Sequence, residues 1–284
     1  MKKAKRAVTN SHQKRFVDLF DKLCYSRNRH SVWSDFVLMA AIEISNAVDQ
    51  VNAPERAETY KRISKQYNDS EKEIFGQMLG AVVDGMEEST DQDFLGELYM
   101  ALELGNDHAG QFFTPYCVCK AMAKITAPNI PDEISKRGWI GVNDPACGAG
   151  ATLVAFANEC RDQGVNYQTS VLFVAQDIDY TVGCMCYLQL SLMGCAGYVI
   201  IDNSITNPST SYDKHGLLPS NKPSTIWYTP FYFRDMWHWR RVAAQMDLFF
   251  QNAKPVTETK VVEEPPQEEQ IEFPVEKNGQ LRLF

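Results

Sequence analysis

The segment Asn143-Asp144-Pro145-Ala146-Cys147-Gly148-Ala149-Gly150-Ala151 decides which fold this chain is expected to adopt. An apolar stretch from Trp139 to Val142 leads to it, and a helical pattern follows from Thr152 to Ala157. This order predicts a strand, a tight turn and the start of a helix. Glycines permit backbone angles that other residues avoid, and the first N–H groups of a helix lack partners within it. The turn therefore suits a ligand that approaches the main chain closely.

Two more strands are expected after this turn, each ending in polar residues. The stretch 171–175 ends in Gln176-Asp177-Ile178-Asp179, and the stretch 198–201 ends in Asp202-Asn203-Ser204, with an apolar helix over 180–192 between them. A carboxylate about thirty residues after the glycines can accept hydrogen bonds from ribose hydroxyls. The pattern predicts an α/β fold with a nucleoside-containing cofactor at the strand ends. A glycine turn alone also occurs for packing reasons.

Two upstream segments make the prediction more specific. They are Asp93-Phe94-Leu95-Gly96-Glu97-Leu98-Tyr99 and Ala109-Gly110-Gln111-Phe112-Phe113-Thr114-Pro115. Together with residues 144–150 they resemble the adenine-N6 DNA methyltransferases of the type I restriction-modification class, over roughly residues 90 to 206. The resemblance implies an α/β, Rossmann-like class I S-adenosylmethionine-dependent methyltransferase domain, only part of which is present, behind a helical N-terminal subdomain.

In that family the segment before the helix and the glycine turn hold S-adenosylmethionine. The resemblance therefore implies a cofactor-binding set made of Gln111, Phe112, Phe113, Thr114, Asp144, Pro145, Cys147, Gly148, Gly150, Asp177 and Asn203. The alternative for residues 111–114 is a plain junction between a loop and a helix. At the end of the third strand either Asp202 or Asn203 would meet the adenine, and a turn cap is the alternative for both.

The catalytic motif of the family is an Asn/Asp-Pro-Pro-Tyr/Phe tetrad at the end of a fourth strand, where it binds the exocyclic amine and stacks on a flipped base. The sequence does not contain this tetrad. Residues 207–210 and 221–224 are poor remnants, and only Thr229-Pro230-Phe231-Tyr232 follows an apolar segment. Thr229, Pro230, Phe231 and Tyr232 are thus the only catalytic candidates, although a threonine replaces a carboxamide poorly.

The organisation of the chain follows from its hydrophobic pattern. Helices are expected over residues 15–48, with Ser31 or Ser34 as a cap, then after Pro54, after Asp69, and from Phe94 to Leu104. We predict a helical subdomain at 1–105, the methyltransferase-like domain at 106–250 and a disordered tail at 251–284. A methyltransferase sheet normally has seven strands, yet only one helical segment follows Tyr232. The chain is then either a non-catalytic relative or is completed by a second, target-recognition subunit.

Composition excludes several classes of protein. The hydrophobic fraction is 44%, and no apolar run is long enough to span a bilayer or to act as a secretory signal, so a cytoplasmic location is expected. The eight cysteines lack zinc-site spacing, which favours small buried thiols and predicts no metal. The net charge of −8 is unusual for a DNA-binding protein, but acidic residues collect in the tail and basic ones elsewhere.

Aromatic and cationic residues gather between Trp227 and Arg241. Such a mixture is typical of surfaces that stack on nucleic acid, which makes DNA a predicted partner. The alternative is that these aromatic side chains cover the end of a shortened sheet.

The tail from 251 to 278 is acidic and rich in proline, which is typical of a flexible tether. It ends in Gln280-Leu281-Arg282-Leu283-Phe284, which resembles the bacterial sliding-clamp-binding peptide. Gln245-Met246-Asp247-Leu248-Phe249 has the same form. The implied clamp contacts are Gln280, Leu281, Leu283 and Phe284, and in the inner copy Gln245, Leu248 and Phe249; the alternative for the inner copy is the end of a packed helix.

The sequence thus predicts a DNA adenine-N6 methyltransferase-like protein that binds S-adenosylmethionine and DNA but does not transfer a methyl group alone. The alternative is a non-catalytic protein that binds DNA or the sliding clamp and modulates restriction-modification or replication.

Overall fold

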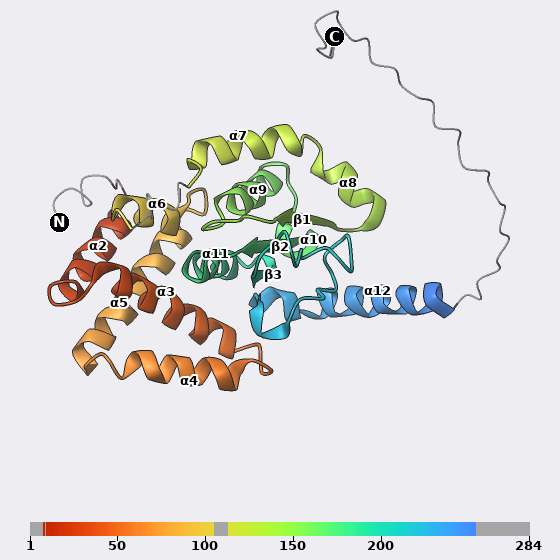
Figure 1. Ribbon diagram of the computed structural model, residues 1–284. Helices are drawn as coiled ribbons and strands as arrows, with labels where there is room; N and C mark the ends of the chain where they lie inside the picture. Colours follow the sequence, from red (N-terminus) through yellow and green to blue (C-terminus); the bar gives the residue numbers. More distant parts are fainter. Residues whose placement is uncertain (1–7, 9, 105–112, 254–284) are drawn as a thin grey trace, which may run out of the picture. The chain divides into compact units, whose positions relative to one another are not determined.

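A computed structural model describes residues 8, 10–104 and 113–253 (Figure 1). The described residues up to 247 belong to one compact unit, and residues 248–253 belong to a second unit. The predicted cofactor residues Gln111 and Phe112 lie outside the described residues, as does the predicted clamp peptide 280–284.

The N-terminal part of the described chain is helical, as the hydrophobic pattern predicts. Its helices are α2 (Ser11–Leu23), α3 (Arg29–Asn46), α4 (Ala53–Ser64), α5 (Asp69–Glu88) and α6 (Phe94–Ala101). The predicted cap of α3 is wrong. Asn28 caps this helix by accepting a hydrogen bond from the Ser31 N–H, whereas the Ser34 hydroxyl bonds to Thr181. Helix α6 ends at Ala101, earlier than predicted, because Glu103 adopts a left-handed φ of 56°.

The rest of the described chain forms an α/β arrangement, which confirms the predicted α/β class. Its strands are β1 (Ile140–Asp144), β2 (Val171–Asp177), β3 (Ala196–Ile201) and β4 (Ile226–Tyr228). Its helices are α7 (Tyr116–Thr126), α8 (Ile130–Arg137), α9 (Ala151–Asp162), α10 (Tyr167–Ser170), α11 (Tyr180–Leu192) and α12 (Asp235–Ala253), with two short 3-10 helices, η2 (Pro223–Thr225) and η3 (Pro230–Phe233).

The sheet has the order β1-β2-β3-β4 within the described residues. Strands β1, β2 and β3 run parallel, so their carboxyl ends meet at one edge, where ligands bind in open α/β sheets. Strand β4 pairs antiparallel with β3, with Tyr228 opposite Tyr198. The last residue of β4 therefore lies at the amino ends of the other three strands.

The two faces of the sheet are covered differently. On one face Phe173 and Val199 share a core with Leu153 of α9 and Leu188 of α11. On the other face the loop after β3 crosses the sheet, where the Tyr198 hydroxyl donates to the Gly216 carbonyl oxygen at 2.6 Å. Helices thus cover one side, and an irregular segment covers the other.

The N-terminal helices and the sheet share one hydrophobic core, which joins Phe16 and Trp33 to Phe173 and Trp227. The boundary predicted near residue 105 stays a prediction. None of the described helices is long and apolar enough to cross a lipid bilayer.

Candidate cofactor site

A cavity of about 210 Å³ lies where β1 and β2 end. The turn between β1 and α9 forms its floor. It is lined by Asp93, Phe113, Thr114, Cys119, Asp144, Ala146, Cys147, Gly148, Ala149, Ala151, Thr152, Asp177 and Val182. The structure therefore brings together six of the predicted cofactor residues, namely Phe113, Thr114, Asp144, Cys147, Gly148 and Asp177.

The turn itself requires its glycines. Gly148 and Gly150 have φ angles of 55° and 96°, in the left-handed region that side chains disfavour. A Cβ on Gly150 would lie 2.8 Å from the sulfur of Cys186, so α11 packs directly against the turn. Gly150 and Pro145 do not line the cavity, and Gly150 acts by shaping its floor.

The carboxylate of Asp177 fixes the turn as well as facing the cavity. Its Oδ2 accepts a hydrogen bond from the Gly148 N–H at 2.9 Å, and its Oδ1 accepts one from the Asp179 N–H at 2.9 Å. Each oxygen has a further lone pair for a ligand hydroxyl. Across the cavity Asp144 accepts hydrogen bonds from the Ala146 N–H at 3.1 Å and from the Thr152 hydroxyl.

The segment before α7 meets the glycine turn, as the resemblance implies. The ring of Phe113 stacks on that of Tyr99, with centroids 5.3 Å apart. A Cβ on Gly148 would lie 3.5 Å from the Phe113 ring, so this ring lies over the turn. Phe113 thus links α6 to the floor of the cavity.

A family model for N-6 DNA methylases matches residues 90–259 of the chain. The chain belongs to the N-6 DNA methylase family. No curated protein matches it. The matched region includes all the residues that line the cavity at the glycine turn.

Two residues that were not among the predicted site residues also hold the site together. Asp93 caps α6 by accepting a hydrogen bond from the Gly96 N–H at 3.0 Å. The side chain of Gln189 in α11 donates to Asp93 at 2.8 Å and to the Ala149 carbonyl oxygen at 2.8 Å. Burial raises the pKa of Asp93 to about 6, an effect that the bonds to Gln189 and Gly96 partly oppose. The capping position of Asp93 was a readable signal, whereas nothing in the sequence distinguishes Gln189.

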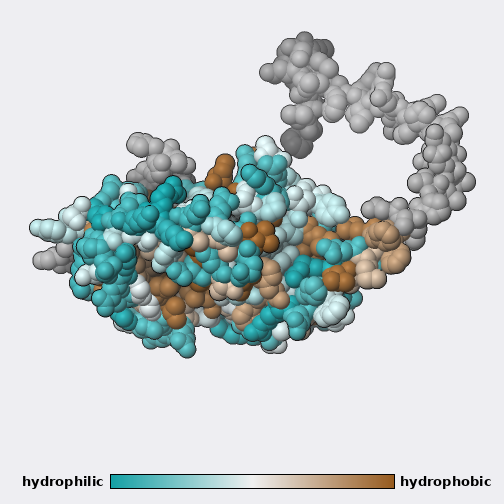
Figure 2. All heavy atoms as spheres, turned by 90° about the horizontal axis from the view of Figure 1, so that it is seen from below, coloured by the Kyte–Doolittle hydropathy of each residue, from teal (hydrophilic) through white to brown (hydrophobic). Residues whose placement is uncertain are grey.

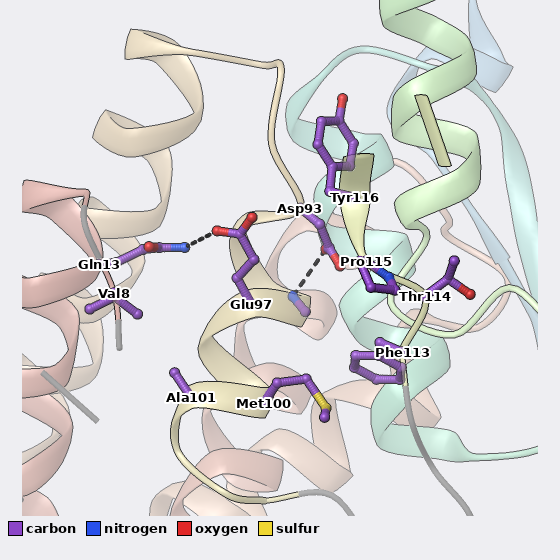
Figure 3. A pocket seen from close by; sticks show the side chains of 11 residues that line it. Val8, Gln13, Asp93, Glu97, Met100, Ala101, Phe113, Thr114, Pro115 and Tyr116 are labelled. Carbon is purple, nitrogen blue, oxygen red and sulfur yellow. Dashed lines mark hydrogen bonds between the residues drawn. The ribbon is translucent and has the colours of Figure 1, made fainter. Parts of the chain in front are cut away.

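A second cavity of about 510 Å³ adjoins the first and shares Asp93, Phe113 and Thr114 with it (Figure 3). Glu97 of α6 and Gln13 of α2 line it, and the Gln13 side-chain amide donates to the Glu97 carboxylate at 3.1 Å. The space beside the glycine turn therefore extends towards the N-terminal helices.

The structure does not bring every predicted residue to the cavity. Asn203 follows β3, but its side chain accepts hydrogen bonds from the Ile205 and Thr206 N–H groups, so it caps a turn. Asp202 accepts from its neighbour, the Asn203 N–H. Both residues therefore make the turn-capping contacts that we gave, from the sequence, as the alternative to adenine binding.

The segment Thr229-Pro230-Phe231-Tyr232 lies at the opposite end of the sheet from the glycine turn, because β4 is antiparallel. Thr229 is fully buried, and its hydroxyl donates to the Cys195 carbonyl oxygen at 2.7 Å. Phe231 packs against Gly194, just before β3. This placement contradicts the idea that the segment is a strand-end remnant of the catalytic tetrad.

The remaining predicted features lie elsewhere in the chain. Gln245, Leu248 and Phe249 lie within α12, a helix rather than an extended peptide. All eight cysteines are free, and Cys117 is exposed on α7. Among the described residues, no three His, Cys, Asp or Glu side chains group as metal ligands would.

Proposed function

We propose that this methylase-family chain binds S-adenosylmethionine in the cavity at the glycine turn. The observation that carries the proposal is the meeting of Asp144, Asp177 and Phe113 around Gly148 at the carboxyl ends of parallel strands. A nucleoside ligand fits this chemistry, since carboxylates accept from ribose hydroxyls and an aromatic ring packs on apolar ligand surface. The Rossmann-like character of the domain is part of the same proposal.

The chain's residues would bind and orient the cofactor. Asp177 would accept from the ribose, and Gly148 would let the ligand lie close to the main chain. The bound cofactor supplies an activated methyl group. The sequence has no Asn/Asp-Pro-Pro-aromatic tetrad to orient an adenine amine, so transfer to DNA would require a second subunit that also recognises the target.

Calorimetric titration of the full chain with S-adenosylmethionine, and with S-adenosylhomocysteine in parallel, tests the proposal. We expect saturable binding that Asp177→Asn weakens by roughly tenfold or more, since a bond to a charged group contributes about 1.5–3 kcal/mol. Asp162→Asn on the exposed side of α9 is the matched control and should bind normally. Absence of binding, or equal affinity in Asp177→Asn, would contradict the cofactor site.

A second candidate function rests on the tail sequence. The peptide Gln280-Leu281-Arg282-Leu283-Phe284 supports docking to the bacterial sliding clamp in the cytoplasm, either to deliver the methylase to DNA or as a non-catalytic modulator of restriction-modification or replication. Deleting residues 280–284 should abolish binding to a purified clamp. Undiminished binding would show that residues 280–284 are not the clamp-binding peptide. If Gln245→Ala abolished binding instead, residues 245–249 would be the clamp-binding segment.

A further inference from the structure

Helix α12 has two different sides within the compact unit. One side is fixed to the domain by Trp237, which is only 1% exposed and whose ring N–H donates to the Gln168 carbonyl oxygen at 3.2 Å. Arg240 donates to the Thr169 carbonyl oxygen at 2.7 Å from the same side. A helix held in this way normally turns polar residues towards solvent.

The outward side of α12 is instead apolar. Met236, Trp239 and Met246 are 45%, 66% and 53% exposed, and Ala243 between them is also exposed. Figure 2 shows hydrophobic residues gathered over this helix at the right of the view. Single exposed apolar residues are ordinary, but an aligned row on one helix marks an interaction surface.

The spacing of this row is that of a coiled-coil seam. Positions 236, 239, 243 and 246 alternate steps of three and four residues, and the sequence continues the pattern at Phe250. Such spacing places each side chain between four residues of a facing helix. The surface therefore fits an α-helix rather than a strand or a nucleic acid.

We propose that this seam, Met236-Trp239-Ala243-Met246, pairs with the same seam of a second copy of the chain. An antiparallel pair centred on Ala243 puts the two smallest side chains where the helices come closest. It places Trp239 of each copy opposite Met246 of the other, and sulfur–aromatic contacts are favourable. A twofold axis uses the same patch on both copies, which closes the assembly as a dimer.

Charge favours this antiparallel arrangement. Asp247 and Arg240 are seven residues apart and so lie on the same flank of the seam. In the antiparallel dimer Asp247 of each copy lies beside Arg240 of the other. Asp247 has no ion-pair or hydrogen-bond partner in the described part of its own chain, and the Arg240 guanidinium is already held by two carbonyl oxygens. A parallel pair would place Asp247 against the other flank of the seam, which carries Asp235 and Val242 and offers no cation.

Sedimentation equilibrium of the full chain over a concentration series tests the proposal, which does not depend on cofactor binding. We expect a species of twice the 32.2 kDa chain mass. Trp239→Lys should raise its dissociation constant at least about tenfold, because buried tryptophans dominate interface energies. Val51→Lys replaces another exposed apolar residue, 81% exposed and distant in sequence, and should leave the dimer unchanged.

A disulfide crosslink tests directly whether the two α12 helices of the dimer cross at Ala243. In a Cys117→Ser background, which removes the exposed native thiol, Ala243→Cys should form a disulfide-linked dimer when diamide oxidises the two introduced thiols, whereas Cys117→Ser alone or with Val51→Cys should not. A chain that is monomeric throughout the concentration series would overturn the proposal and leave the seam to another protein or to the chain's own tail. A dimer that persists in Trp239→Lys, or that Ala243→Cys does not crosslink, would place the interface elsewhere.

Discussion

The carboxyl group of Asp93 connects three parts of the site. It caps α6, accepts from Gln189 and lines both cavities. It is buried, and its pKa is raised to about 6. A buried acid of this kind holds its proton more tightly in the folded chain than in the unfolded one, so its titration is linked to stability.

Asp93→Asn should change how stability depends on pH. In the native chain this group's contribution is fully present below its ordinary pKa of 3.8 and is lost as the pH rises through about 6. The free energy of unfolding falls by at most roughly 3 kcal/mol through this group, because each unit of pKa shift corresponds to about 1.4 kcal/mol. The amide keeps an acceptor oxygen for the Gly96 N–H but does not ionise.

Urea unfolding of the native chain and of Asp93→Asn, at pH 4.5 and pH 7.5, measures this effect. The native chain should lose more stability than the variant between the two values. An identical loss in both proteins would mean that Asp93 has an ordinary pKa.

At the scale of elements, the direction of β4 decides what the residue directly after it, Thr229, does. Thr229 N–H donates to the Gly197 carbonyl oxygen, and its hydroxyl accepts from the Gly197 N–H, both at 3.0 Å. The residue therefore ties the end of β4 to the start of β3. Its role is to hold the sheet together at the end that lies away from the glycine turn.

Thr229→Val should destabilise the fold without affecting the cofactor site. The valine keeps the shape of the side chain but leaves the buried Gly197 N–H and Cys195 carbonyl without this partner. Such a loss costs about 1–3 kcal/mol. Thermal unfolding measures the loss of stability, and calorimetry with S-adenosylmethionine checks that the cofactor affinity is unchanged. A weakened cofactor affinity would show that residues 229–232 do contact the cofactor site.

Over the whole compact unit, one buried cation joins the helical region to the sheet. Arg56 of α4 donates to Asp49 at 2.8 Å, to the Ser45 hydroxyl, and to the Ile226 carbonyl oxygen of β4 at 2.7 Å. Its guanidinium lies 4.0 Å from the ring centroid of Trp227. Both members of the ion pair are buried, so neither can turn to water if the other is removed.

Arg56→Met should destabilise the chain strongly, because Asp49 would remain as an unpaired buried charge. Breaking a buried pair in this way costs about 3–5 kcal/mol. Chemical denaturation measures the cost, with Arg62→Met on the exposed side of the same helix as the control. Adding Asp49→Asn to Arg56→Met should recover part of the loss, and no recovery would argue against the charge as its cause.

The sequence by itself determined the parts of this protein that depend on neighbouring residues. The glycine turn, the acidic residues at the strand ends and most of the helices were readable because turn geometry and hydrophobic spacing are local, whereas α8 and α10 were not expected. The resemblance placed Phe113 and Gly148 in one predicted cofactor-binding set, and the structure brings these two residues into contact.

Only the tertiary structure decided the features that join distant residues. From the sequence alone, β4 could pair at either edge of the sheet and run parallel or antiparallel to its neighbour. Its apolar residues are compatible with all of these arrangements. Gln189 became the link between Asp93 and Ala149 because α11 crosses behind the turn. The exposed apolar row of α12 was not anticipated from the sequence, since hydrophobic spacing cannot tell which side of a helix is left facing solvent.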